Sequence, residues 1–142
     1  MKQQSYKSHG RYIFTWHILT FLSVLAVIIG SIINLINSTK ENLYSASLLV
    51  LVSLILASLV WYARRFAVKA QDRAIRAEEN FRHFILTGKP LDSRLRMGQI
   101  VGLRFASDEE FPALAKKAAE EGLGQKIIKQ SIKNWRADHN RV

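Results

Sequence analysis

The 142-residue chain contains no cysteine, two prolines and seven glycines. Without cysteine, disulfide frameworks, thiolate metal sites and cysteine nucleophiles are excluded. Acidic and basic residues are missing from two long stretches, residues 12–39 and 42–63, apart from the ordinarily neutral His17. Each stretch exceeds the roughly 20 apolar residues that a helix needs to cross a bilayer core. This pattern excludes a soluble globular protein, and too few residues follow the second stretch for a large catalytic domain.

The two uncharged stretches predict two transmembrane helices, at residues 13–36 and 43–62. Because only residues 37–42 separate them, we expect an antiparallel hairpin over residues 13–63, after a cytoplasmic segment at residues 1–12. The first span is longer than the roughly 7 to 15 apolar residues of a signal peptide, and no small-residue cleavage site follows it. We therefore expect it to be retained as an anchor.

Basic residues gather at the open end of the hairpin and are nearly absent from its loop, where Lys40 is balanced by Glu41. The flanking set is Lys2, Lys7, Arg11, Arg64, Arg65, Lys69, Arg73 and Arg76. Since cytoplasmic flanks are enriched in lysine and arginine, we expect both termini in the cytoplasm. Four aromatic residues are expected at the same end, at the level of the headgroups: Tyr12, Trp16, Trp61 and Tyr62.

The second helix is expected to continue beyond the membrane through residues 64–87. No glycine or proline interrupts it before Gly88 and Pro90, a pair that is typical of a helix end. At about 1.5 Å per residue, this cytosolic extension is roughly 35 Å long.

The remaining residues, 88–142, predict a small basic domain of three short helices. We expect the first from Asp92 or Ser93 to Phe105, the second from a capping pattern at residues 107–110 to Gly122, and the third over residues 124–139. Pro112 offers an alternative start for the second, because proline favours the first helical position. Three short helices are marginally stable as an independent core, so we expect them to pack on the long helix, on a second copy or on a partner. The predicted fold is therefore all-α: a transmembrane helical hairpin, an extended second helix and a small C-terminal helical domain.

Small and aromatic residues recur on the cytosolic extension with alternating spacings of four and three. We call them the alanine seam: Ala63, Ala67, Ala70, Ala74, Ala77, Phe81 and Phe84. This is a heptad pattern, and alanine lets another helix approach closely. Two alternatives follow, cover by the protein's own terminal helices or contact with a partner helix or a second copy.

Other faces of the predicted helices are basic. The basic stripe lies on the extension and consists of Arg64, Arg65, Lys69, Arg73 and Arg76. It predicts contact with anionic headgroups. The alternative is a solvated face whose charges only set the membrane topology. The last predicted helix places four more basic residues opposite its apolar side: Lys126, Lys129, Lys133 and Arg136. These are candidates for contact with phosphates or an acidic partner, or form a solvated face.

Signals for catalysis are missing. The four histidines, His9, His17, His83 and His139, fall in different predicted elements without metal-ligand spacing. The sequence also has no P-loop, dinucleotide fingerprint or nucleophile elbow. We therefore predict no catalytic residue, metal, cofactor or small-molecule substrate, and a non-enzymatic role.

Four strings of mixed charged and aromatic residues carry a resemblance that covers nearly the whole chain. They are QSYKSHGRY at residues 4–12, AQDRAIRAEE at 70–79, LRFASDEE at 103–110 and IKNWRADHNRV at 132–142. With these, the chain resembles an uncharacterised bacterial family of small two-span membrane proteins, a domain of unknown function. The resemblance implies a bacterial inner-membrane location and brings no known activity.

These features together favour an accessory or scaffold subunit that binds a membrane complex, or a second copy, through its helices. The alternative function is a membrane-tethered module that binds nucleic acid or the ribosome through its basic domain. We also expect Asp72, Glu78 and Glu79 to pair with Arg104, Arg136 or Arg141 when the terminal helices dock. Such pairs would fix the docking register, since exposed ion pairs contribute only about 0 to 1 kcal/mol.

Overall fold

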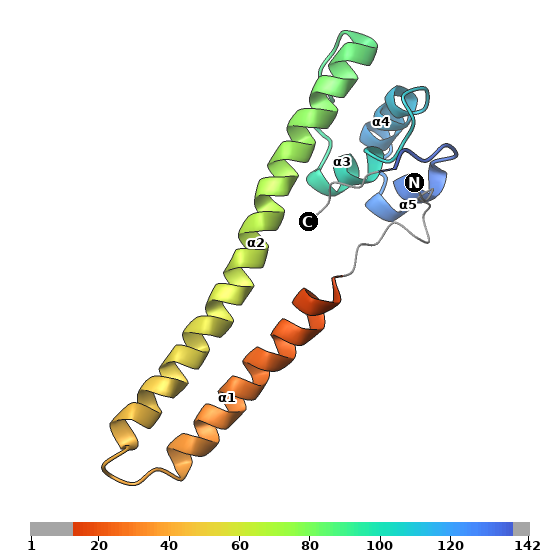
Figure 1. The fold of residues 1–142 in the computed structure, drawn as a ribbon. Helices are drawn as coiled ribbons and strands as arrows, with labels where there is room; N and C mark the ends of the chain where they lie inside the picture. Colours follow the sequence, from red (N-terminus) through yellow and green to blue (C-terminus); the bar gives the residue numbers. More distant parts are fainter. Residues whose placement is uncertain (1–12, 138–142) are drawn as a thin grey trace. The chain divides into compact units, whose positions relative to one another are not determined.

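A computed structural model describes residues 13–137, and all regular elements among them are helical (Figure 1). The elements are a π-helix η1 (Thr15–Thr20) and the α-helices α1 (Phe21–Ile36), α2 (Leu43–Thr87), α3 (Met97–Leu103), α4 (Phe111–Glu120) and α5 (Gln125–Ser131). The expected all-helical fold, with two long apolar helices and a small C-terminal helical part, is confirmed. The chain forms two compact units, which divide between Ala67 and Val68 on α2.

The first unit is a helical hairpin in which α1 and the first part of α2 run antiparallel (Figure 1). The helical segments Thr15–Ile36 and Leu43–Thr87 are both long and apolar enough to cross a membrane. The first begins as the π-helix η1 rather than as an α-helix. Its wider turn brings the Thr20 hydroxyl to 3.1 Å from the carbonyl oxygen of Thr15, five residues earlier.

The long helix α2 ends where the sequence predicts. It runs to Thr87, and Gly88 follows with φ at +71°, a left-handed conformation that favours glycine. The Gly88 N–H donates to the carbonyl oxygen of Phe84 at 2.8 Å, which satisfies one of the last carbonyls of the helix.

The second unit has its own apolar core, built mainly by the three short helices. Leu103, Phe105, Phe111 and Ile128 are fully buried there, and α2 contributes Ile75. Of the three packing partners considered for the short helices, the long helix is therefore the one that the structure contains.

Two short helices have other bounds than predicted. The predicted helix from Asp92 or Ser93 to Phe105 is in fact α3, Met97–Leu103. Asp92 instead accepts hydrogen bonds from Arg94 in a turn, and the Gln99 side chain caps α3 by accepting the backbone N–H of Arg96 at 2.7 Å. The second, α4, begins at Phe111 with Pro112 in its first turn, which agrees with the alternative start, and ends at Glu120.

The predicted last helix over residues 124–139 is wrong in its second half. The helix α5 ends at Ser131, and the chain then continues in extended conformation at Ile132. The following segment pairs with residues 105–107: the Arg136 N–H donates to Phe105 O at 2.8 Å, and Trp135 forms an isolated antiparallel bridge with Ala106. These long-range hydrogen bonds replace those that a longer helix would have made.

Candidate interaction surfaces

Small residues line the interior of the hairpin. The Ser31 hydroxyl of α1 donates to Ser53 Oγ of α2 at 3.2 Å, and both residues are buried, as is Ala46. The Ser53 hydroxyl in turn donates to the carbonyl oxygen of Val50 at 2.7 Å. Short side chains therefore occupy the positions at which the two helices contact each other.

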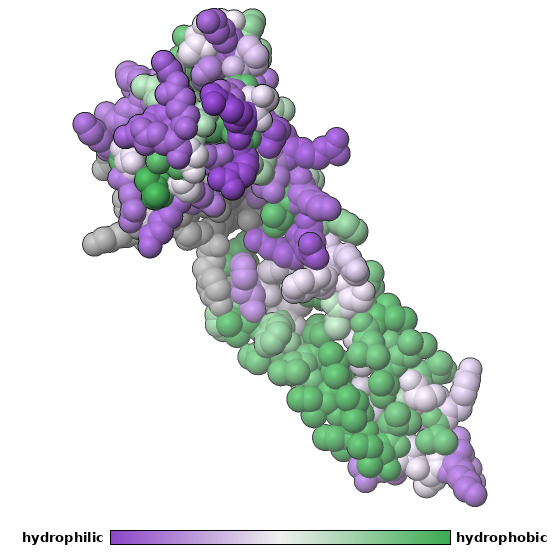
Figure 2. Space-filling view, turned by 180° about the vertical axis from the view of Figure 1, so that it is seen from behind, coloured by the Kyte–Doolittle hydropathy of each residue, from purple (hydrophilic) through white to green (hydrophobic). Residues whose placement is uncertain are grey.

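The face of the hairpin that is visible in Figure 2 is mainly apolar. Leucine, isoleucine, valine and phenylalanine side chains are exposed along both helices, among them Phe21, Ile33 and Leu51. Such a continuous apolar surface exceeds what soluble monomers expose and marks contact with lipid or another protein.

The predicted interfacial aromatics Trp16, Trp61 and Tyr62 are all exposed, while Tyr12 lies outside the described residues. Tyr62 stacks on Phe66 with ring centroids 5.7 Å apart, and the Arg65 guanidinium lies 5.9 Å from the Trp61 ring. Arg65 thus lies beside an amphipathic ring, a combination that suits a headgroup region.

The second unit holds α2 through one face of that helix. Ile75 and Glu79 are buried on it, and Arg82 lies one turn further. Arg82 forms ion pairs with Glu79 and with Asp108, from the segment before α4. The sequence predicted that Glu79 pairs with Arg104, Arg136 or Arg141, whereas the structure pairs it with Arg82, three residues further along the same helix. Arg82 was not predicted, because nothing but its place on the face of Ile75 indicates this role. Of the other expected members, Arg141 lies outside the described residues.

The alanine seam lies on a different face of α2 and is open. Ala63, Ala70, Ala74 and Ala77 are exposed, as are Phe81 and Phe84, and only Ala67 is half-buried. Cover by the protein's own terminal helices, one of the two alternatives, is therefore contradicted, because those helices pack on the face of Ile75 instead. The seam remains available to another helix.

Four residues of the basic stripe are exposed, namely Arg65, Lys69, Arg73 and Arg76, while Arg64 is half-buried. They occupy a third face of α2, beside the seam.

The second basic set does not form one helical face. Lys126 and Lys129 lie on α5, whereas Lys133 and Arg136 follow the end of that helix. Lys129 is only 8% exposed, and its Nζ lies 5.1 Å from the centre of the Phe105 ring. Lys126, Lys133 and Arg136 are exposed. Lys129 is therefore directed into the domain rather than toward a phosphate.

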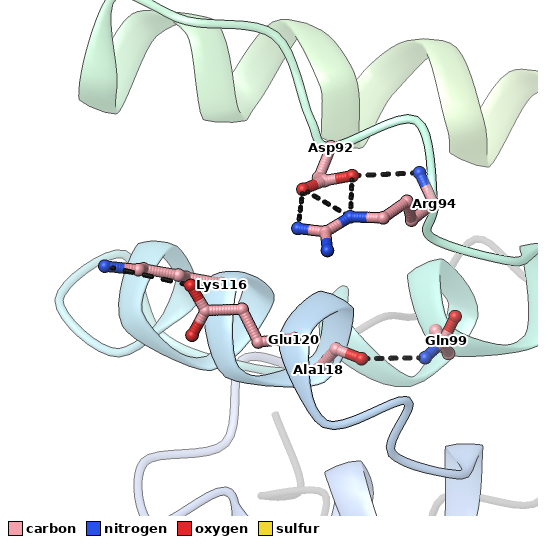
Figure 3. Close-up of polar contacts among 6 residues, drawn as sticks. All are labelled: Asp92, Arg94, Gln99, Lys116, Ala118 and Glu120. Carbon is pink, nitrogen blue, oxygen red and sulfur yellow. Dashed lines mark hydrogen bonds and ion pairs between the residues drawn. The ribbon is translucent and has the colours of Figure 1, made fainter.

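Polar contacts in the second unit serve its folding (Figure 3). Gln99 is buried and donates to the carbonyl oxygens of Ala118 and Leu123, both at 3.0 Å, which ties α3 to the end of α4. Hydrogen bonds from the Arg94 side chain and backbone lower the pKa of Asp92 to about 2. Both contacts hold chain segments in place.

No group of three or more histidine, aspartate or glutamate side chains suited to a metal ion occurs among residues 13–137. An open hollow of about 500 Å³ lies between the end of α2 and α4 and includes His83. The Nδ1 atom of His83 lies 2.8 Å from the carbonyl oxygen of Lys89, so this ring fastens the turn that follows α2.

The described chain is thus an all-helical protein with two potentially membrane-crossing helices and a small helical unit that packs on the second. It belongs to a family of unknown function (DUF6526), whose model matches residues 1–142. The expected resemblance to an uncharacterised family is confirmed. No curated protein and no solved structure matches the chain significantly.

Proposed function

We propose that the protein is a non-enzymatic accessory or scaffold subunit of the bacterial inner membrane. In this role the hairpin anchors the chain in the bilayer, both termini lie in the cytoplasm, and the small basic domain is presented at the cytoplasmic surface. The outward surfaces of the helices bind other membrane components. The observation that carries the proposal is that apolar surface remains exposed on both units after the chain has folded.

The hairpin surface supports the anchor. Its interior is filled by small residues such as Ser31, Ser53 and Ala46, so its large aliphatic side chains point outward. Burying a leucine or isoleucine side chain away from water is worth about 1.5 to 3 kcal/mol, and lipid provides that burial along both helices. The basic residues at the open end then set the orientation, and their side chains lie where anionic headgroups attract them.

The exposed alanine seam supports a binding role for the second unit. Phe81 and Phe84 are large apolar side chains on a helix face that the described residues of the unit leave exposed. Because Phe81 lies 18 residues beyond Ala63, the end of the uncharged stretch, we place this face outside the bilayer. A protein is thus the fitting partner for this face.

The first experiment is an affinity isolation of the full-length protein from its own membranes in mild detergent, with cross-linking at Lys69 and neighbouring lysines. We expect resistance to alkaline carbonate extraction and a membrane protein recovered in fixed stoichiometry, a second copy included. Release by carbonate would contradict the anchor. Recovery of nuclease-sensitive ribosomal or DNA-binding proteins, without a membrane partner, would support the alternative function instead.

The alternative function, binding of nucleic acid, depended on a continuous basic face of the last predicted helix. A continuous basic helical face over residues 126–136 is not formed, since α5 ends at Ser131 and Lys129 is buried. We therefore propose the accessory or scaffold role alone.

A further inference from the structure

A strip of apolar residues faces away from the core of the second unit. We call it the outer strip: Ala70, Ala74, Ala77, Phe81, Phe84 and Ile85. Its three large members lie close together, with Phe81 and Ile85 each 66% exposed and Phe84 52% exposed. Large apolar side chains in such a cluster are typical of a surface that binds another protein.

The charges beside the outer strip have opposite signs on its two sides. With Ala74 and Phe81 at position a of the heptad and Ala77 and Phe84 at position d, Arg73 takes position g and Glu78 position e. Both charged residues are exposed. In a parallel coiled coil, a residue at g faces the residue at e five positions later on the other helix, and such pairs set orientation and partner choice.

We propose that the outer strip binds the same strip of a second copy of this chain, with the two α2 helices parallel. Arg73 of each copy then pairs with Glu78 of the other, which gives two symmetry-related ion pairs across one two-fold axis. The alanines let the helix axes approach closely, and the phenylalanines bury most of the apolar area.

Charge complementarity selects this orientation. In an antiparallel pair centred on the strip, position g faces g and position e faces e, so Glu78 would approach Glu78 of the other copy and Arg73 would face Asn80 instead of a carboxylate. The parallel orientation also rests on the proposed function, because two copies inserted in one membrane with the same topology have parallel α2 helices.

Among the described residues, the domain leaves the large side chains of the outer strip exposed, since its core uses the face of Ile75 and Glu79. The edge of the strip, at Phe81 and Ile85, borders a hollow that Asp108 and Arg136 also line. On the helical wheel, at about 100° per residue, Ile75 and Ala77 are about 160° apart. A second copy can therefore dock without displacing the C-terminal helices.

Cysteine cross-linking tests the dimer, and the absence of native cysteine makes every introduced thiol unique. Single variants Ala70→Cys and Ala77→Cys place the thiol at position d, while Lys69→Cys and Arg76→Cys place it one residue away, on the basic stripe. We expect oxidation of isolated membranes that contain the full-length protein to give disulfide dimers at both d positions, with at least about tenfold higher yield than at the controls. Equal yields at all four positions, or adducts only with another protein, would overturn the proposal.

Charge reversal in the Ala77→Cys background tests the ion pairs. Arg73→Glu and Glu78→Arg should each lower the dimer association constant about tenfold, because two attractive pairs become repulsive. The combined variant should restore it, since the signs are then exchanged. Single reversals without effect would overturn the arrangement. Carbonate extraction of the same membranes separates the two proposals: release would contradict the anchor, whereas retention without dimers would contradict only the self-association.

Discussion

Arg82 and Asp108 lie 26 positions apart in the sequence and are joined directly: Arg82 Nε donates to Asp108 Oδ1 at 2.7 Å. The same guanidinium donates to the carbonyl oxygen of Ala106 at 2.7 Å and to Glu79 Oε2 at 3.0 Å, and it lies 4.4 Å from the centre of the Phe111 ring. One arginine of α2 thereby fixes the segment that leads into α4.

The first prediction concerns removal of this arginine. Arg82→Met should lower the free energy of unfolding of the second unit by about 3 to 5 kcal/mol, because Glu79 would remain buried without its cation. Glu79 is only 6% exposed, so water replaces the lost partner only in part. Thermal unfolding of the full-length protein in detergent, together with limited proteolysis after Leu86, measures the change.

Two matched variants make this prediction specific. Asp108→Asn should cost only about 0 to 1 kcal/mol, because the Asp108 side chain is 61% exposed and can bind water. Adding Glu79→Gln to Arg82→Met should recover more than half of the loss, since no uncompensated charge is then buried. A double variant that is less stable than Arg82→Met would contradict the assigned role of Glu79.

The second prediction uses two glycines of α3. A Cβ atom at Gly102 would lie 3.2 Å from Cγ2 of Ile128 and 3.3 Å from the carbonyl oxygen of Gln125, so α3 and α5 would have to separate. Gly102→Ala should therefore destabilise the second unit by about 1 to 3 kcal/mol.

Gly98 is the matched control, because a Cβ atom there meets nothing closer than 3.6 Å. Gly98→Ala should leave the midpoint of thermal unfolding unchanged or raise it, since alanine is favoured over glycine in a helix by about 1 kcal/mol. Equal destabilisation by the two substitutions would contradict the close approach of α3 and α5.

The third prediction concerns pH. The Arg94 side chain, and then its backbone N–H, lowers the pKa of Asp92 from 3.8 to about 2. Because the folded-state pKa is depressed, the contribution to stability is complete above about pH 4 and is lost as the pH falls toward 2. Arg94→Gln should raise the pKa of Asp92 toward 3.8, as followed by NMR titration of its carboxyl carbon, while Arg96→Gln should leave it in place.

Local signals were sufficient for the long elements. The uncharged stretches and the Gly88 stop define α1 and α2 because charge, helix continuity and helix termination depend on neighbouring residues. The end of α5 was missed because it depends on a contact far away in sequence: residues 134–136 form backbone hydrogen bonds with residues 105–107. The residue pattern around Ser131 does not show that these long-range hydrogen bonds compete with continuation of the helix.

The docking face of α2 was missed for a related reason. Ile75, Glu79 and Arg82 share one side of the helix, but two of the three are charged and are expected in solvent. Burial of these charged side chains becomes favourable only when Arg82 donates hydrogen bonds to Asp108 and to the carbonyl oxygen of Ala106. The alanine seam could be read from spacing alone, whereas its exposure required knowledge of where the short helices pack.

The last prediction concerns the interior of the hairpin, where Ser31 and Ser53 lie with their hydroxyl oxygens 3.2 Å apart. In a chain without cysteine, the double variant Ser31→Cys with Ser53→Cys should form an intrachain disulfide under mild oxidation, because the two side chains already face each other. Ser31→Cys with Ser58→Cys is the control, since Ser58 is exposed on α2. Mobility on a non-reducing gel and alkylation of free thiols measure the bond, and free thiols in both variants would contradict the antiparallel register of α1 and α2.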